Sequence, residues 1–223
     1  MTASNRITVD PDETVATYWR RRLEQHVHDS YRGLQLAKFP EDLRAYQHII
    51  ERSRPEIIVE IGTGAGGSAL WFADQLTSIL GDGLVVTIDV THPKAISDDR
   101  ITFIHGDAVE RFGVVKELID ETHGYILKTT GVDRAVRVMV VDDASHMYEQ
   151  TLSTLRSYNT LIPSGSFYIV EDTIVDTPLS IWPNTQGAGG AVKTFLAETT
   201  RFVAEPYDIY GLTMHMGGWL RAI

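Results

Sequence analysis

Four acidic residues and one histidine follow two apolar segments in the second half of the chain. They are Asp142, Asp143 and His146, in the sequence DDASH, and Glu171 and Asp172, in the sequence IVEDT. Four carboxylates close together would repel one another unless a cation lay among them. Oxygen ligands without cysteine favour a hard divalent ion such as Mg²⁺ over zinc. We therefore expect a magnesium site. In the alternative interpretation, two of the acids cap the following helices and the others are solvated.

His146 lies close to Asp143 in the sequence, at the start of a predicted helix at 147–161. Its imidazole would face the same crevice as the acids. A histidine titrates near neutral pH and can take a proton from a hydroxyl group. We therefore predict that His146 acts as a general base, although a structural, hydrogen-bonded histidine is the alternative. No comparable group of acids is expected beside the other histidines that we considered: His92, His105, His123 and His215.

The segment 57–68 reads IIVEIGTGAGGS, which indicates a buried strand, a glycine-rich turn and the start of a helix. Glycines allow the backbone to approach a ligand closely, and a helix N-terminus directs free N–H groups and a positive dipole end at it. The segment therefore predicts a nucleotide-type site. The residues that we expect to bind the cofactor here are Glu60, Gly62, Thr63, Gly64, Gly66 and Ser68.

The identity of the nucleotide depends on Glu60. The glycines also satisfy the G-x-G-x-x-G pattern of dinucleotide-binding proteins, with Asp89 roughly 20 residues further on. A carboxylate before the turn would not help to bind a pyrophosphate, whereas a zwitterionic sulfonium ligand would tolerate it. The pattern E-x-G-x-G-x-G is typical of the first motif of class I S-adenosylmethionine-dependent methyltransferases. We predict S-adenosylmethionine, with a nicotinamide cofactor as the alternative.

Composition excludes several other classes of function. The net charge is -10, which argues against nucleic acid as a partner and favours a small molecule. The 223 residues include no cysteine, so no disulfide, thiolate nucleophile or Cys-bound zinc is expected. No signal-peptide segment and no apolar run of about 18 residues is found, so we expect a cytoplasmic protein without a membrane partner.

Strands and helices are predicted to alternate from residue 57 onward. Further strands are expected at 84–88, 101–104, 136–141 and 166–170, and helices at 68–80, 110–122 and 147–161. This order predicts an α/β fold with a mostly parallel, doubly wound, Rossmann-like sheet that has helices on both faces.

Acidic residues follow the predicted strands and would meet at the carboxyl edge of this sheet, where ligands bind in such folds. We expect Asp89 to accept the ribose hydroxyls of the cofactor and Asp107 to accept the adenine amino group, with Asp142 also at the cofactor. The alternative for Asp89 and Asp107 is that a polar residue simply ends each strand.

Two further helices are expected before the first strand of the sheet. One runs from Pro11 to about Val27, with Trp19 and Leu23 on its apolar face, and the other begins at Pro40. The second helix has an apolar face of Leu43, Tyr46, Ile49 and Ile50. We predict an N-terminal helical cap at 1–50 and a catalytic domain at 51–223.

These motifs resemble the cephalosporin hydroxylase/rhamnosyl O-methyltransferase family and the related macrocin-type sugar O-methyltransferases. The resemblance rests on Gly33, Lys38, Pro40, Asp42, Leu43, Tyr46, VEIGTGAGGS, DDASH, IVEDT and, near the end, Phe195, Leu196, Phe202, Gly211, Leu212, Thr213, Gly218, Trp219, Leu220 and Arg221. It covers nearly the whole chain from about Tyr31. DDASH with IVEDT is more specific than the glycine-rich segment.

The resemblance implies that Asp143, Glu171 and Asp172 hold Mg²⁺ and that His146 is the general base. Asp143, rather than Asp142, is favoured for the metal by its spacing to the histidine. It also implies a Mg²⁺-dependent O-methyltransferase that acts on a sugar or another natural-product hydroxyl, and a homo-oligomer. Ala144 departs from the usual DDGSH sequence, and 120–133 matches no part of the family pattern.

Three other functions remain open from the sequence. A nicotinamide oxidoreductase fits the glycines but leaves the acids and His146 unexplained. Hydroxylation would require an iron or flavin system for which we find no motif. A protein that binds S-adenosylmethionine and assists another enzyme is the third.

The segment 173–190, with Trp182 and Pro183, either closes over the substrate or is an ordinary surface loop.

Overall fold

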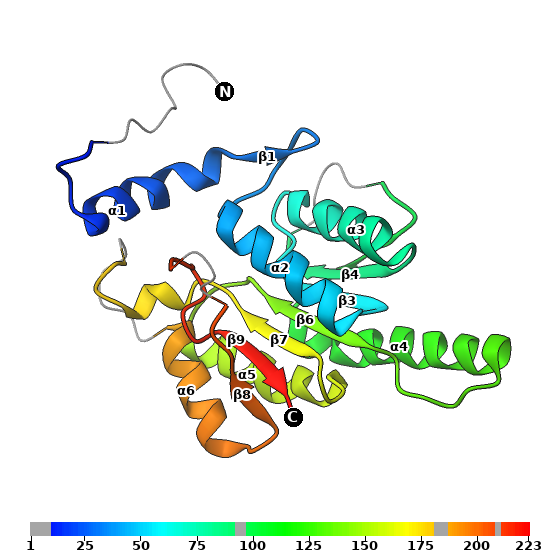
Figure 1. The fold of residues 1–223 in the computed structure, drawn as a ribbon. Coiled ribbons are helices and arrows are strands. Elements are labelled where there is room, and N and C mark those ends of the chain that lie inside the picture. Colours follow the sequence, from blue (N-terminus) through cyan, green and yellow to red (C-terminus); the bar gives the residue numbers. More distant parts are fainter. Residues whose placement is uncertain (1–9, 92–96, 181–186, 208–210) are drawn as a thin grey trace.

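The computed structural model describes residues 10–91, 97–180, 187–207 and 211–223. Within these ranges the chain forms a seven-stranded sheet in the order β5-β4-β3-β6-β7-β9-β8, with a small hairpin β1-β2 beside it (Figure 1). The strands are β1 (Ser30–Tyr31), β2 (Leu34–Gln35), β3 (Ile57–Ile61), β4 (Leu84–Asp89), β5 (Ile101–His105), β6 (Val138–Asp142), β7 (Phe167–Val170), β8 (Phe202–Ala204) and β9 (Trp219–Ala222). The helices are α1 (Val15–Gln25), α2 (Pro40–Ser53), α3 (Gly67–Leu80), α4 (Ala108–Thr130), α5 (Tyr148–Tyr158) and α6 (Ala188–Glu198), with short 3-10 turns η2 (His26–His28), η3 (Asn159–Leu161) and η4 (Thr173–Asp176).

The first five strands of this order are parallel, and β9 and β8 complete the sheet in antiparallel pairing. Successive side chains of a strand point to opposite faces of a sheet. In β3, Ile57 and Val59 share a core with α4, α5 and α6, whereas Ile58 shares a core with α2 and α3. The helices therefore cover both faces (Figure 1), and the predicted doubly wound α/β fold is confirmed.

The N-terminal part of the chain differs in detail from the prediction. The first helix begins at Val15, after Thr14 caps it, and Val27 lies in η2 with 38% of its surface exposed. Trp19 and Leu23 are buried as predicted, in a core that includes Met214 near the other end of the chain.

The second N-terminal helix, α2, begins at Pro40 as predicted, because proline is favoured at the first helical position. Tyr46, Ile49 and Ile50 are fully buried against the sheet and α3. The predicted domain boundary after residue 50 therefore falls inside a helix that packs on the sheet.

Helix α4 is longer than the predicted 110–122 and includes most of the segment 120–133. Its buried face continues past Ile119 to Ile126, which keeps helical spacing, and Gly131 ends the helix in a left-handed conformation. The distal half extends beyond the edge of the sheet (Figure 1). None of the helices in the described ranges is long and apolar enough to span a lipid bilayer. Trp182 and Pro183 of the predicted closing loop lie outside the described residues.

Candidate active site

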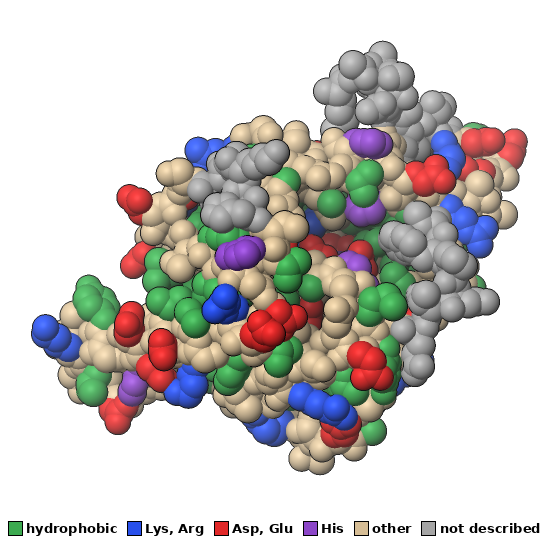
Figure 2. Space-filling view, turned by 180° about the vertical axis from the view of Figure 1, so that it is seen from behind, with side chains coloured by type: hydrophobic (Ala, Val, Ile, Leu, Met, Phe, Trp, Pro, Cys, Tyr) green, Lys and Arg blue, Asp and Glu red, His purple; other side chains and the backbone are tan. Residues whose placement is uncertain are grey.

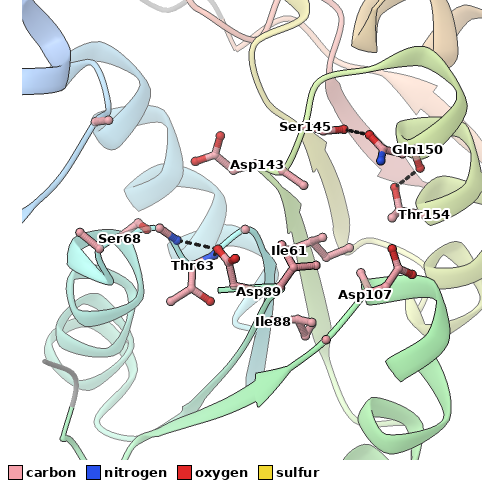
Figure 3. A pocket seen from close by; sticks show the side chains of 18 of the residues that line it. Ile61, Thr63, Ser68, Ile88, Asp89, Asp107, Asp143, Ser145, Gln150 and Thr154 are labelled. Carbon is pink, nitrogen blue, oxygen red and sulfur yellow. Dashed lines mark hydrogen bonds between the residues drawn. The ribbon is translucent and has the colours of Figure 1, made fainter. Parts of the chain in front are cut away.

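A pocket of about 470 Å³ opens at the carboxyl ends of β3, β4, β5 and β6. This volume suits a small-molecule or cofactor site. Figure 3 shows Asp89, Asp107 and Asp143 around it, one from the end of each of three strands. The predicted residues that line the pocket are Gly62, Thr63, Gly64, Ser68, Asp89, Asp107 and Asp143. The predicted cofactor residues Glu60, Gly66 and Asp142 are not among those that line it.

Gly62 allows two loops to meet at the floor of this pocket. Its φ is +97°, and a Cβ atom there would lie 2.2 Å from the backbone oxygen of Asp143. Gly67 plays a similar part at the first turn of α3, where a Cβ atom would lie 2.1 Å from the backbone oxygen of Gln35. The glycine-rich segment is therefore required by backbone packing as well as by ligand approach.

Asp89, the last residue of β4, connects this strand to the glycine-rich loop by hydrogen bonds. Its Oδ2 accepts hydrogen bonds of 2.9 Å from the backbone N–H groups of both Thr63 and Gly64, and its Oδ1 accepts one from the N–H of Thr91. Burial by itself would raise the pKa of Asp89, but these backbone donors lower it below its ordinary value. The carboxylate thus stays ionised at the pocket, and its role at the ribose hydroxyls remains a prediction.

Asp107 lies on the opposite side of the pocket and caps α4. Its Oδ1 accepts hydrogen bonds from the N–H groups of Val109 (2.9 Å) and Glu110 (3.1 Å). The side chain is exposed. Oδ1 of Asp107 therefore caps the helix, in agreement with the alternative interpretation of a polar residue where the strand ends. The predicted contact with the adenine amino group would involve Oδ2.

Glu60 in β3 and Asp142 in β6 are both buried carboxyl groups that do not line the pocket. Glu60 accepts a 2.6 Å hydrogen bond from the hydroxyl of Thr87, and burial raises its pKa to about 7. Asp142 accepts hydrogen bonds from the hydroxyls of Thr154 and Tyr168, and burial raises its pKa to about 6. Both carboxyl groups therefore have partners within the protein core.

The acids and His146 form a cluster beside the pocket. Nε2 of His146 lies 3.7 Å from Oδ1 of Asp143 and 3.5 Å from Oδ2 of Asp172. Burial would lower the pKa of His146, but Asp172 and Asp143 outweigh it and raise the pKa above its ordinary value. In the space-filling view, acidic and histidine side chains lie within a hollow on one face of the molecule (Figure 2). The structure therefore brings together residues that follow two different strands, β6 and β7, and are separated along the chain.

Lys38 is a member of this cluster that the sequence reasoning missed. Its Nζ lies 2.8 Å from Oδ2 of Asp143 and 2.6 Å from Oε1 of Glu171, and its side chain is 2% exposed. Burial would lower the pKa of Lys38, but these two carboxylates, with Glu60, raise it above its ordinary value. Part of the cationic charge expected from a metal ion is thus supplied by the chain. The only sequence signal for Lys38 was its place in the family pattern.

His215 also belongs to the cluster, so the expectation that it lacks acidic company was wrong. Its Nδ1 accepts a 3.0 Å hydrogen bond from the N–H of Asp172, which places the ring proton on Nε2. That nitrogen is 3.7 Å from Oε2 of Glu171 and 3.8 Å from Oδ2 of Asp42. Burial lowers the pKa of His215 to about 4, so the ring is neutral at pH 7. The acids come from distant segments, which local sequence does not reveal.

The donor set of the cluster fits a hard divalent cation. Ligand atoms of Asp143, His146 and Asp172 lie within 4.8 Å of one another, as do those of Glu171, Asp172 and His215. The buried Nε2 of His215 carries the ring proton and has no hydrogen-bond partner among the described residues, so it faces the cluster as a donor and not as a ligand. Asp172 belongs to both groups, so the three acids lie next to one another in the cluster. Carboxylate oxygens are the ligands that Mg²⁺ prefers.

The backbone at two residues of this cluster is held in an uncommon conformation. His146 has a φ of +56° and Asp172 a φ of +53°, the left-handed region that residues with a Cβ atom rarely adopt. Such conformations cost free energy and persist where the surroundings impose them, often at functional sites. Both residues are therefore fixed by the loops that carry them.

A model of the family described as Rhamnosyl O-methyltransferase/CmcI matches residues 24–223 of this chain. Rhamnosyl O-methyltransferase of Mycobacterium bovis (strain BCG / Pasteur 1173P2) is 24% identical over 153 residues, which cover 66% of this chain and 58% of that protein. Rhamnosyl O-methyltransferase of Mycobacterium leprae (strain TN) is 25% identical over 150 residues, which cover 65% and 60%. The matches thus span about three fifths of the length of these relatives.

Solved structures share the fold. An apo structure of CmcI-N160 has a TM-score of 0.64 and 22% identity, over 97% of this chain and 81% of that chain. A structure of CmcI-D160 with Mg and SAM has a TM-score of 0.62 and 21% identity, over 98% and 88%. An O-methyltransferase from Bacillus cereus in complex with SAH has a TM-score of 0.52 and 17% identity, over 87% and 84%. Together with the family model, which spans residues 24–223, these findings confirm the predicted class I methyltransferase fold. The chain belongs to the Rhamnosyl O-methyltransferase/CmcI family.

Proposed function

We propose that this protein is a Mg²⁺-dependent O-methyltransferase that moves a methyl group from S-adenosylmethionine to a hydroxyl group of a small molecule. The observation that carries this proposal is the position of Asp143. It lines the pocket that the glycine-rich loop forms, and its Oδ1 lies 3.7 Å from Nε2 of His146 in the acidic cluster. A cofactor pocket and a cluster with a candidate base and metal ligands therefore adjoin at one residue.

The cofactor is proposed from the pocket and from the relatives together. The pocket combines backbone N–H groups at the start of a helix with two carboxylates, Asp89 and Asp107, that suit hydroxyl and amino donors. Structures of CmcI are described with SAH and with Mg and SAM. A nicotinamide cofactor remains the alternative that fits the same loop pattern.

In this proposal, Asp143, Glu171 and Asp172 hold the metal ion and His146 accepts the proton. A bound Mg²⁺ would lower the pKa of the acceptor hydroxyl and fix its direction. Bound S-adenosylmethionine would supply a sulfonium methyl group for the hydroxyl oxygen, and the electron pair of the broken methyl–sulfur bond would stay on sulfur. A cation among the acids would offset the charges of Asp172 and Asp143 that raise the pKa of His146, so that its Nε2 could accept the hydroxyl proton. Holding the two reactants close together can supply roughly 7–11 kcal/mol by proximity.

The acceptor is proposed to be a sugar or another natural-product hydroxyl. The relatives are named rhamnosyl O-methyltransferases, and the acidic character of the chain favours an acceptor without phosphate charge. We further propose a homo-oligomer, which light scattering of the purified protein would test.

The proposal is tested by methyl transfer to a rhamnosyl acceptor, with and without EDTA. Asp143→Ala and Glu171→Ala should each abolish turnover, while calorimetry should still detect S-adenosylmethionine binding. Asp133→Ala, which changes an acid with a 79% exposed side chain, is the matched control and should remain active. Full activity in either cluster variant would refute the metal site. Binding of NAD instead of S-adenosylmethionine would favour an oxidoreductase. Cofactor binding without transfer to any acceptor would favour an accessory protein.

A further inference from the structure

The ammonium group of Lys38 is enclosed by acids. Lys38 contacts Asp143 and Glu171, and the charge of the buried Glu60 also helps to raise the pKa of Lys38. Tyr46 donates a 2.6 Å hydrogen bond to the same oxygen of Glu171, Oε1, that Lys38 contacts. The Lys38 and Tyr46 side chains therefore fix the inner side of the cluster.

Each of the two carboxylates uses one oxygen for Lys38 and leaves the other free of it. The free Oδ1 of Asp143 faces His146, and the free Oε2 of Glu171 faces His215, each at 3.7 Å from the ring Nε2. These are two of the carboxylates that we propose as metal ligands. The inner oxygens are thus neutralised by the chain, and the outer oxygens remain available.

The charge balance explains why such a group is needed. Glu171 has a side chain that is 2% exposed, and Asp143 lies beside it. Removing one partner of a buried ion pair leaves a charge that is strongly destabilising. A site that holds a metal ion only part of the time needs another cation to remain folded in its absence.

We propose that Lys38 is the internal counter-cation of the metal site, a positioning residue that acts through Asp143 and Glu171. It neutralises the inner oxygens of both acids before a divalent ion binds and leaves the outer oxygens for that ion. This inference rests on the proposed function for the identity of the ion, and on the observed contacts for the role of the lysine.

The test compares thermal unfolding in EDTA and in saturating MgCl₂. Lys38→Met removes the charge and keeps the length of the side chain, so its midpoint in EDTA should fall by roughly 10 °C. Mg²⁺ should restore at least half of that loss, a larger rise than in the wild-type protein. By linkage, Lys38→Met should also bind Mn²⁺ more tightly, by about tenfold, in electron paramagnetic resonance titrations.

Two variants serve as controls. Lys38→Arg keeps the positive charge and should stay within about 3 °C of the wild-type midpoint in EDTA. Lys116→Met removes an exposed lysine that pairs with Asp120 on α4, and should change neither the midpoint nor its dependence on Mg²⁺. If only the aliphatic part of the Lys38 side chain mattered, Mg²⁺ would raise the thermal midpoint of Lys38→Met by the same amount as that of the wild-type protein.

Each outcome decides the inference. A Lys38→Met protein as stable in EDTA as Lys116→Met overturns it. So does an ordinary response of Lys38→Met to Mg²⁺ when the wild-type protein binds Mn²⁺. If the wild-type protein binds no Mn²⁺, the metal part of the proposed function fails.

The double variant Lys38→Met/Glu171→Gln decides the role of the lysine in that case, and also if Lys38→Met does not fold. A thermal midpoint of the double variant in EDTA that recovers toward the wild-type value supports a counter-cation. A midpoint that does not recover refutes it.

Discussion

Glu60 is a fully buried carboxyl group on the central strand β3, and its protonation is linked to stability. Burial raises its pKa from 4.5 to about 7, against the opposing effects of Lys38 and of hydrogen bonds from Ser68 and Thr87. The folded protein therefore binds this proton more tightly than the unfolded chain. The resulting stabilisation is complete below pH 4.5 and is lost as the pH rises through about 7.

We predict that Glu60→Gln, which cannot ionise, becomes more stable than the wild-type protein as the pH rises from 5 to 9. The difference in the free energy of unfolding should reach roughly 3 kcal/mol, the equivalent of the shift in pKa. Urea denaturation without cofactor at each pH measures it. Glu51→Gln, at an exposed position of α2, is the control and should show no such trend. A difference for Glu60→Gln that does not vary with pH would contradict the burial of the ionised form.

His215 holds the backbone of Asp172 through its Nδ1. We expect His215→Phe to lower the free energy of unfolding by about 1–3 kcal/mol, because the N–H of Asp172 loses its acceptor. His215→Asn should lose less, since its side-chain oxygen can occupy a position near that of Nδ1. Chemical denaturation compares the two. Equal losses would show that ring packing, rather than this hydrogen bond, explains the stability.

The glycine-rich turn between β3 and α3 lies against the backbone that follows β6. Gly62→Ala would place a Cβ atom 2.2 Å from the backbone oxygen of Asp143, at a φ of +97°. Gly64 has a φ of +51° and no atom within 4 Å of such a Cβ, so it is the matched control.

We predict that Gly62→Ala costs roughly 2–4 kcal/mol of stability and weakens the binding of S-adenosylhomocysteine, because the two loops of the pocket floor must separate. Gly64→Ala should cost only about 1–2 kcal/mol, the ordinary cost of a left-handed residue. Denaturation and calorimetry measure both effects. If the two variants bind the ligand equally well, the packing of Gly62 against Asp143 does not shape the pocket.

The two N-terminal helices pack into different parts of the molecule: α2 shares a core with the sheet, and α1 shares one with the segment around Met214. Arg22 of α1 makes two 2.6 Å hydrogen bonds to Glu41 of α2, and Trp19 and Leu23 of α1 pack with Met214. Asp42 of α2 accepts a hydrogen bond from the N–H of the same Met214. The N-terminal segment is thus bound to the last part of the chain, around the acidic cluster.

We therefore predict different results from two truncations. A protein that lacks 1–28 should fold with a lowered midpoint, because it loses only α1 and η2. A protein that lacks 1–53 should not fold, because Tyr46, Ile49 and Ile50 no longer cover the sheet. Burial of each of these three side chains contributes about 1.5–3 kcal/mol to the free energy of unfolding. Their sum is comparable with the total stability of many domains. Circular dichroism during heating measures both. A cooperative transition of the shorter protein would support the predicted boundary at residue 50.

The sequence by itself determined the alternation of strands and helices, the glycine-rich turn and the acids at the strand ends. Each of these depends on residues close together along the chain. Strand runs such as 57–61 are apolar because both faces are buried, and an acid that follows a parallel strand must lie at the carboxyl edge. For this reason Asp89, Asp107 and Asp143, which follow three different strands, line one pocket.

Only the tertiary structure decided which charges neutralise this edge. Lys38 is separated from Asp143 by 105 positions and from Glu171 by 133, and His215 reaches Asp172 across 43. Such contacts form because α2 and the C-terminal segment pack over the same end of the sheet, and packing between distant segments leaves no periodic pattern in the sequence. Burial then fixes the protonation of Glu60 and His215, because desolvation depends on the whole surrounding fold.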